Sequence, residues 1–368
     1  MKEYDVAVIG GGAAGTAAAL GAVNAGARRA LLFERDDVLG GILNQCAHRG
    51  FGLLYFGEDL TGMAYAERFR EVIRTANIEV LTGTAVLRIE QDNRLLFTGR
   101  ACGLGSIAAK AVVLATGCRE IPIGALPVAG SRPSGIFSAG MAQRMLTLSG
   151  YRIGHKAVIL GSGDVGMIVA RELAVRGVEV IAVIEQRDVC GGLARNRAAC
   201  LDAYQIPLVL RTTINRVDGM NRVNGVRTRN LDTGEEQYYA CDTLIVSAGL
   251  LPERELLEDM VLKTGKVAVS LFVCGNACFV HDVVDEVSLE SYKTGSFAAD
   301  YALGKTTLAD IALAAHAPER DLTAKTCVAC PKACRIRETP DGYAGMICGR
   351  EKPVLESAMP AAAAHGLG

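Results

Sequence analysis

The sequence contains no tryptophan, and aromatic residues make up only 5% of its 368 positions. Proteins that bind single-stranded nucleic acids stack bases on aromatic side chains, so this scarcity argues against that function. The formal net charge is −1, which gives no excess of positive charge to attract nucleic acid or an anionic membrane surface. We therefore expect a protein that binds no nucleic acid.

Long apolar runs and targeting segments are also lacking. No apolar run approaches the roughly 20 residues that a membrane-spanning helix needs. The first five residues lead directly into a β-branched run and lack the pattern of a secretory signal. The sequence therefore predicts a cytoplasmic protein without a transmembrane segment.

Glycine is abundant instead, with 42 residues, and its most informative use is a motif that occurs twice. In the first copy, an apolar run over residues 4–9 leads into Gly10, Gly12 and Gly15, and a second apolar run ends at Glu34. This order predicts a strand, a glycine turn, a helix, a second strand and an acid. Such a βαβ unit binds dinucleotides, with the pyrophosphate at the helix N-terminus and the acid on a ribose.

The second copy repeats this order after an apolar run at residues 156–160. It contains Gly161, Gly163 and Gly166, and its acid is Glu185. The first glycine and the acid are 24 residues apart in both copies, which indicates an internal repeat. In each copy the first glycine permits a tight turn, the second admits a pyrophosphate, and the third allows close helix packing.

Two dinucleotide sites in one chain suggest one bound flavin and one exchangeable nicotinamide. Glu185 favours NADH, because a carboxylate accepts the free 2′-hydroxyl and repels the 2′-phosphate of NADPH. Arg187 lies two residues further on and could partly offset this repulsion, although a solvated loop charge is the better interpretation of it.

Three later strand ends complete the pattern. The apolar runs at 111–115, 242–247 and 271–274 end close to Thr116-Gly117, Ala248-Gly249 and Gly275-Asn276. With the flavin half first and interrupted by the nicotinamide half, this order resembles the flavoproteins with two dinucleotide-binding domains. The resemblance implies that Thr116, Gly117, Gly275 and Asn276 contribute to the FAD site. In most members the last motif is Gly-Asp, so Asn276 would bind a ribityl hydroxyl or a phosphate without carrying a charge.

The predicted fold class is α/β, with two Rossmann-like domains of which the NAD domain is inserted into the FAD domain. We expect residues 1–120 and 241–310 to form the FAD domain and residues 121–240 to form the NAD domain. Residues 321–368 are expected to form a small cysteine-rich module that binds a metal or a cluster, because so short a segment has little room for a core.

Three further segments narrow the resemblance: residues 40–52, residues 190–196 and residues 274–285. They are similar to the small FAD/NAD-binding subunits that partner anaerobic glycerol-3-phosphate dehydrogenase-like and opine or amino-acid dehydrogenase-like flavoproteins. This resemblance covers about residues 1–305. It implies an electron-transfer subunit of a hetero-oligomer, in which a larger dehydrogenase subunit binds the substrate.

Several cysteines and histidines leave alternatives open. Cys46 has no second cysteine two or five residues further on, which disfavours a disulfide reductase. Cys46 and His48 either face the flavin or are a packed thiol and a loop residue. His281 and Asp282 form either a pair near the flavin or a structural pair in a loop. The sequence identifies no catalytic acid or base, and a self-sufficient NADH oxidase or peroxidase would have to use Cys46.

Four cysteines cluster near the end of the chain, at Cys327, Cys330, Cys334 and Cys348. Four thiolates suit either tetrahedral zinc or an iron–sulfur cluster. We favour a cluster, because a flavin can convert a hydride pair into single electrons; a zinc-bearing assembly subunit and free thiols are the alternatives. The segment also resembles a small cysteine-rich domain that is fused to, or encoded beside, these subunits and is expected to bind a cluster.

Overall fold

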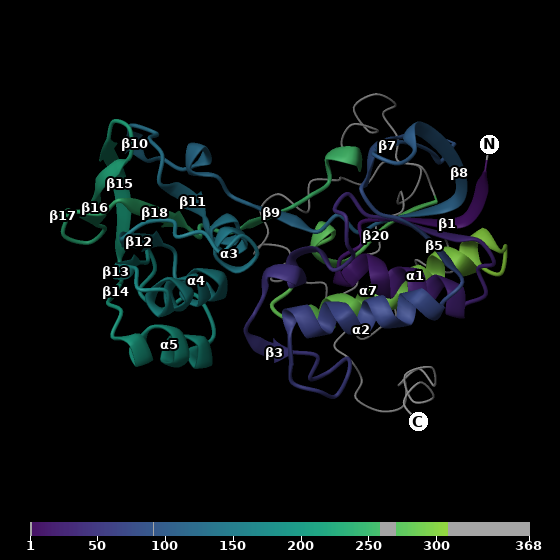
Figure 1. Cartoon of the computed structure of the whole chain (residues 1–368), viewed down its shortest axis with the longest axis horizontal. Helices are drawn as coiled ribbons and strands as arrows, with labels where there is room; N and C mark the ends of the chain where they lie inside the picture. The colour runs from purple at the N-terminus through teal and green to yellow at the C-terminus, as the bar shows by residue number, and fades with distance from the viewer. Residues whose placement is uncertain (1, 91, 258–269, 308–368) are drawn as a thin grey trace. The chain divides into compact units, whose positions relative to one another are not determined.

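The computed structural model describes residues 2–90, 92–257 and 270–307 (Figure 1). Its contacts divide the chain into two compact units, Met1–Cys118 with Pro252–Gly368, and Arg119–Leu251. Among the described residues, no helix combines the length and the apolar character needed to cross a membrane.

The first unit contains a seven-stranded sheet. Its strands are β1 (Glu3–Ile9), β2 (Ala30–Phe33), β5 (Ile78–Leu81), β6 (Thr84–Ile89), β7 (Arg94–Gly99), β8 (Gly103–Leu114) and β20 (Leu271–Val273). The order is β5-β2-β1-β8-β7-β6, with β20 paired to β8. Strands β5, β2, β1, β8 and β20 pair in parallel, whereas β6 and β7 are joined to β8 as antiparallel hairpins. A short ribbon pairs β3 (Arg49–Phe51) with β4 (Leu60–Thr61).

Three helices lie along one face of this sheet (Figure 1). They are α1 (Ala13–Asn24), α2 (Gly62–Thr75) and α7 (Val284–Ala302), with the short 3-10 helices η1 (Gly41–Gln45) and η4 (Gly275–Ala277) beside them. Helix α1 is buried from Ala14 to Ala22. Side chains at Gly21 and Gly295 would overlap the backbone of the other helix, so α1 and α7 pack backbone against backbone.

The second unit repeats the parallel architecture. Its five-stranded sheet has the order β11-β18-β12-β13-β14, and a four-stranded sheet has the order β10-β15-β16-β17. The strands are β10 (Ala129–Gly130), β11 (Ile136–Ser138), β12 (Lys156–Leu160), β13 (Glu179–Ile184), β14 (Leu208–Val209), β15 (Thr212–Gly219), β16 (Val223–Asn230), β17 (Glu236–Tyr239) and β18 (Thr243–Val246). The helices are α3 (Ala139–Thr147), α4 (Asp164–Val175) and α5 (Ala194–Cys200), with η2 (Ile123–Ala125) and η3 (Asp202–Tyr204). Two connecting strands, β9 (Cys118–Glu120) and β19 (Leu250–Pro252), pair with each other.

The predicted α/β fold with two Rossmann-like halves is confirmed, but one predicted boundary is wrong. Residues 241–251 were expected in the first domain, whereas β18 pairs in parallel with β12 in the sheet of the second unit. The backbone pairing decides this, because the apolar strand is equally suited to the interior of either parallel sheet.

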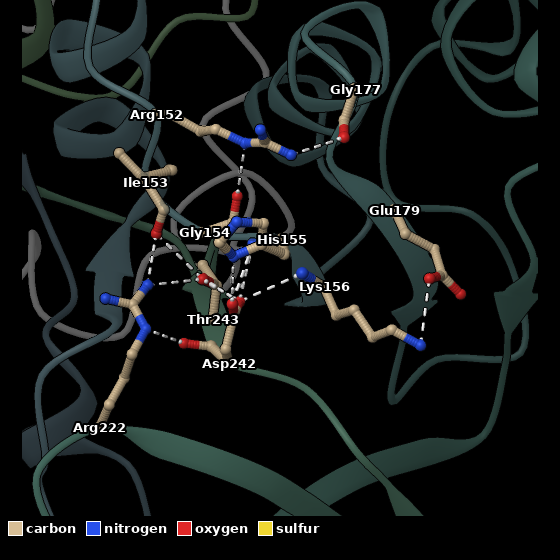
Figure 2. A network of polar contacts seen from close by, with 10 residues as sticks. All are labelled: Arg152, Ile153, Gly154, His155, Lys156, Gly177, Glu179, Arg222, Asp242 and Thr243. Carbon is tan, nitrogen blue, oxygen red and sulfur yellow. Dashed lines mark hydrogen bonds and ion pairs between the residues drawn. The ribbon is translucent and has the colours of Figure 1, made fainter.

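A polar network fixes the starts of β12 and β18 in the second unit (Figure 2). The Asp242 carboxylate accepts the N–H groups of His155 and Lys156, at 3.0 and 3.1 Å, and the hydroxyl of Thr243 at 2.9 Å. Burial raises the pKa of Asp242, but these hydrogen bonds lower it by more, so the pKa lies below its usual value. The ionised carboxylate therefore holds the two neighbouring strands in register.

We expect Asp242→Asn to lower the free energy of unfolding at pH 7 by about 1–2 kcal/mol, because charge-assisted hydrogen bonds become neutral ones. The stabilisation is present above the pKa of the unfolded chain, about 3.9, and is lost as the pH falls through the lower folded-state pKa. Urea unfolding of the variant and the wild type should therefore converge in acid. The exposed Glu235→Gln is the control, and a difference that persists unchanged in acid would contradict the assignment.

Candidate dinucleotide sites

The first glycine loop joins β1 to α1, and its three glycines differ in their surroundings. Gly10 has a φ of +107°, and a Cβ there would overlap the carbonyl oxygen of Ala115. A Cβ on Gly15 would overlap the carbonyl oxygen of Gly10, so the first helical turn lies directly on the loop. A Cβ on Gly12 would meet nothing closer than the Cα of Gly41 at 4.0 Å. The first and third glycines are thus required by packing, while the middle one leaves open space.

The second loop, between β12 and α4, has the same construction. Gly161 has a φ of +100°, and a Cβ there would overlap the carbonyl oxygen of Ser247. A Cβ on Gly166 would lie 2.5 Å from the carbonyl oxygen of Gly161, and one on Gly163 would meet nothing within 4 Å. The sequence repeat is therefore also a repeat of backbone packing, with an open middle position that fits a pyrophosphate in both copies.

The acid of the first copy holds the loop in place. Glu34 is buried; its Oε2 accepts the N–H of Gly11 at 2.8 Å and its Oε1 accepts the N–H of Asp36 at 2.7 Å. Burial raises the pKa of Glu34 by more than these two hydrogen bonds lower it. The Glu34 carboxyl group, which was predicted to bind a ribose, therefore also stabilises the first glycine loop through its hydrogen bond with Gly11.

The acid of the second copy is held by more donors. Glu185 Oε2 accepts both the N–H and the O–H of Ser162, at 3.0 and 2.6 Å. Its Oε1 accepts the N–H of Arg187 at 3.0 Å, and the Arg187 Nε lies 3.4 Å away. Burial raises the pKa of Glu185, but these donors lower it by more, so the pKa is below its usual value. Arg187 is exposed, as expected, and is also an ion-pair partner of the acid.

A further glycine follows each acid by six residues, Gly40 after Glu34 and Gly191 after Glu185, and donates a hydrogen bond to the glycine loop. Gly40 donates its N–H to the carbonyl oxygen of Gly11 at 2.8 Å. Gly191 donates its N–H to the hydroxyl of Ser162 at 2.7 Å. Sequence reasoning did not recognise these glycines as part of the repeat, although their common spacing from the acid was the signal that could have revealed it.

The two helix N-termini differ in charge. Helix α1 has neither a side-chain cap nor an acid in its first turn, so its free N–H groups and positive dipole end remain available to an anion. Helix α4 begins with Asp164, whose Oδ1 accepts the N–H of Leu193 at 2.8 Å and the Asn196 amide at 2.7 Å. The second site therefore attracts phosphates less strongly, which suits an exchangeable ligand.

Three strands of the first unit end at the same edge. In the register of the sheet, Ile9 pairs with Leu114, and Leu114 pairs with Val273. The residues that follow are the first glycine loop, Thr116-Gly117 and Gly275-Asn276. Phe33, at the end of β2, also pairs with Ile9 and is followed by Glu34, so the predicted FAD residues of the first unit all lie at one edge of one sheet.

The turns that follow β8 and β20 leave open space at Gly117 and contain the side-chain amide of Asn276. Thr116 donates its hydroxyl to the carbonyl oxygen of Glu253 at 2.6 Å, and a Cβ on Gly117 would meet nothing within 4 Å. A Cβ on Gly275 would lie 2.6 Å from the Cβ of Ala14, which places this turn against the first turn of α1. The partly exposed Asn276 follows it directly.

A hollow of about 370 Å³ lies next to the first acid. It is lined by Arg35, Gly83, Ala85, Thr98, Gly99 and Arg100. Its lining residue Arg35 directly follows Glu34, the acid predicted to bind a ribose. Ala85, Thr98 and Gly99 come from β6 and β7, far in the sequence from the glycine loop, so no local motif predicted them.

The contacts of Cys46, His48 and His281 bear on the alternatives that the sequence left open for them. Cys46 is buried with its Sγ 3.4 Å from the carbonyl oxygen of Ile42, and the ring of the partly exposed His48 lies 4.8 Å from the ring of Phe51. These positions favour a packed thiol and a loop residue. The predicted pairing of His281 with Asp282 is wrong: His281 pairs with the buried Glu290, as described below.

The predicted metal ligands Cys327, Cys330, Cys334 and Cys348 lie outside the described residues. Within the described part of the chain, no group of three or more histidines, cysteines or acids could hold a metal ion.

Gly12, the middle glycine of the first loop, has open space around it, so its role in FAD binding can be tested separately from its role in folding. Gly12→Ala adds a methyl group where the protein leaves room, so we expect a folded chain that binds FAD at least about tenfold more weakly. Gly15→Ala is the matched control, and its methyl group should lower the melting temperature of the FAD-free chain. The ratio of flavin to protein absorbance measures the FAD content, and thermal unfolding measures stability, so the two effects are separated. A normal FAD content in Gly12→Ala would refute the assignment of Gly12 to the FAD site.

Asp164→Asn should strengthen NADH binding. The variant keeps an acceptor oxygen for Leu193 and Asn196 but removes a charge from the helix N-terminus, where a charge contributes about 0.3–1 kcal/mol. The dissociation constant for NADH should fall about two- to fivefold at low salt. Calorimetric titration measures this, with Glu179→Gln at the opposite end of the sheet as control, and weaker binding would contradict the electrostatic argument.

Comparisons with known proteins agree with this geometry. A model of the family described as "Pyridine nucleotide-disulphide oxidoreductase" matches residues 4–276. The chain is 24% identical to thioredoxin reductase of Treponema pallidum over 265 residues, which are 70% of this chain and 80% of the relative. It is 27% identical to an alkyl hydroperoxide reductase component of Staphylococcus aureus, over 71% of this chain and 49% of the relative. It is 29% identical to sarcosine oxidase subunit alpha of a Corynebacterium, over 67% of this chain and 26% of the relative. The chain thus spans half or less of the last two relatives.

Solved structures share the fold. Thioredoxin reductase of T. acidophilum superposes with a TM-score of 0.67 at 19% identity, over 83% of this chain and all of that one. L-proline dehydrogenase from P. horikoshii superposes with a TM-score of 0.57 at 19% identity, over 85% of this chain and 58% of that one. Because the family model covers well over half of the sequence, including both glycine loops, the chain belongs to the pyridine nucleotide-disulphide oxidoreductase family and is an FAD-dependent, NAD(P)H-linked oxidoreductase.

Proposed function

We propose that this chain is the FAD-containing, NADH-linked electron-transfer subunit of a multi-subunit dehydrogenase. In this proposal a larger partner subunit binds a substrate of the glycerol-3-phosphate, opine or amino-acid type. The observation that carries the proposal is the combination of two complete dinucleotide loops with no cysteine pair suited to disulfide reduction in the same part of the chain.

The cysteines argue against direct disulfide reduction. Residues 1–307 contain eight cysteines, and no two of them are separated by two intervening residues. None of these eight forms a disulfide within the described part of the chain, and five are buried. Burial raises the pKa of Cys241 to about 11 and also raises the pKa values of Cys200 and Cys274. Such thiols behave as apolar core residues rather than as nucleophiles, because the reactive form is the thiolate.

Two relatives support a partner that oxidises an amine or amino acid. The proteins named sarcosine oxidase subunit alpha and L-proline dehydrogenase both match this chain over part of their length. A flavoprotein domain that occurs as part of larger amine-oxidising proteins is consistent with a subunit that exchanges electrons with a partner.

In this proposal, each dinucleotide is bound by its own set of residues. The backbone at Gly12 and Gly163 and the N-termini of α1 and α4 would bind the pyrophosphates, and Glu34 and Glu185 would hold the riboses. Bound FAD and NADH would supply the hydride and electron chemistry. The protein's contribution is mainly the positioning of the two coenzymes, which needs no catalytic acid or base.

For the cysteine-rich segment we propose an iron–sulfur cluster bound by Cys327, Cys330, Cys334 and Cys348, with zinc as the alternative metal. Four thiolates suit both, and a one-electron centre is useful beside a flavin because it carries the electrons onward singly. A non-catalytic assembly subunit would instead carry zinc at these positions.

Anaerobic purification with any bound partner, followed by titration with NADH, tests the proposal. We expect NADH to bleach the flavin absorbance, and we expect iron with acid-labile sulfide in the same sample. Cys330→Ser should lose the iron and keep the flavin, whereas the exposed Cys102→Ser should lose neither.

Three results would count against it. A flavin that NADH does not reduce would contradict the NADH-linked role, and zinc without sulfide would contradict the cluster. Rapid NADH turnover with oxygen by the isolated chain, abolished in Cys46→Ser, would instead identify a self-sufficient oxidase.

A further inference from the structure

A buried histidine–glutamate pair lies next to Asn276 in the first unit. The side chains of His281 and Glu290 are only 3% and 7% exposed, and Nε2 of the histidine lies 3.1 Å from Oε2 of the glutamate. The same carboxylate oxygen accepts the N–H of Gly275 at 3.2 Å. The other oxygen, Oε1, is buried and has no hydrogen-bond partner among the described residues.

The hydrogen bonds of His281 fix which way the Asn276 amide faces. The backbone N–H of His281 lies 3.0 Å from the Asn276 side chain, and a backbone N–H can only donate. The atom facing it must therefore be the acceptor Oδ1. The histidine Nδ1 lies 3.3 Å from the same oxygen. The donor group Nδ2 is consequently directed away from the histidine, and it lies 3.6 Å from the Sγ of Cys118.

The histidine ring contacts a different residue at each of its two nitrogens. Nδ1 faces the Asn276 oxygen and Nε2 faces the Glu290 carboxylate, so both ring nitrogens face acceptors. The ring therefore connects the buried carboxyl group of Glu290 to the side-chain oxygen of Asn276. Because the backbone N–H of His281 contacts the same oxygen, the pair holds the Asn276 amide in one orientation.

Asn276 is the partly exposed end of this arrangement. It follows β20 at the edge where the first glycine loop and Thr116-Gly117 also lie. Its contact with Cys118, two residues after Thr116, keeps the amide on that side. An N–H donor fixed at this edge suits an oxygen acceptor of a dinucleotide.

We propose that His281 and Glu290 are positioning residues that hold the Asn276 Nδ2–H as a fixed, uncharged donor to an oxygen of bound FAD. This inference rests on the proposed FAD site. It also explains why an amide occupies position 276: a carboxylate there would face the Glu290 carboxyl group across one imidazole ring, and two negative charges at so short a distance repel each other.

A double-mutant cycle on the full-length, FAD-free chain tests this coupling, with FAD titration by fluorescence as the readout. We expect Asn276→Asp to weaken FAD binding about tenfold in the wild-type background and only about twofold in the Glu290→Gln background, where one carboxylate has been removed. Glu286→Gln, on the exposed side of the same helix, is the control background and should preserve the tenfold loss.

An equal loss in the Glu290→Gln and wild-type backgrounds would overturn the inference, because a merely structural role of Glu290 produces no rescue. Should Glu290→Gln not fold, the loss of FAD binding in Asn276→Leu is compared in the wild-type and His281→Phe backgrounds: a smaller loss in His281→Phe, where the donor is no longer held, supports the inference, and an equal loss overturns it. A wild-type chain that binds no FAD would overturn the proposed function as well, which distinguishes the two failures.

Discussion

The architecture depends on one steric constraint that occurs twice, the contact of the first helical turn with the carbonyl group of the first loop glycine. The contact of Gly15 with Gly10 leaves no room for a side chain on Gly15, and the contact of Gly166 with Gly161 leaves none on Gly166. This contact brings the helix N-terminus to the end of the strand, where its free N–H groups face the space over the middle glycine. The acid of the following strand then fixes the loop through the amide next to the first glycine.

The duplicated scaffold is electrostatically unequal. Helix α1 is almost wholly buried and has no acid at its start, whereas α4 begins with Asp164. The first acid is held by backbone donors, while the second also receives the Ser162 hydroxyl and pairs with an exposed arginine. This difference is consistent with the proposed function, in which one coenzyme stays bound and the other exchanges.

Local spacing made the glycine loops, their helices and their acids predictable from the sequence, because each βαβ unit is encoded within about 30 residues. The placement of residues 241–251 was not predictable, since only the pairing of β18 with β12 decides which sheet the strand joins. The partner of His281 was missed for a similar reason. The adjacent Asp282 was the obvious partner in sequence, but the register and packing of α7 bring Glu290 to the ring. The cysteine ligands lie outside the described residues, so their pairing with a metal stays a prediction.

We propose that one chain holds two dinucleotides at once, at two separate sites. Counting the ligands bound to the purified chain tests this most directly, by absorbance for FAD and by equilibrium dialysis for NADH under anaerobic conditions. We expect one FAD per chain that excess NADH does not displace, together with one exchangeable NADH. Displacement of FAD by NADH at a total of one dinucleotide per chain would contradict it.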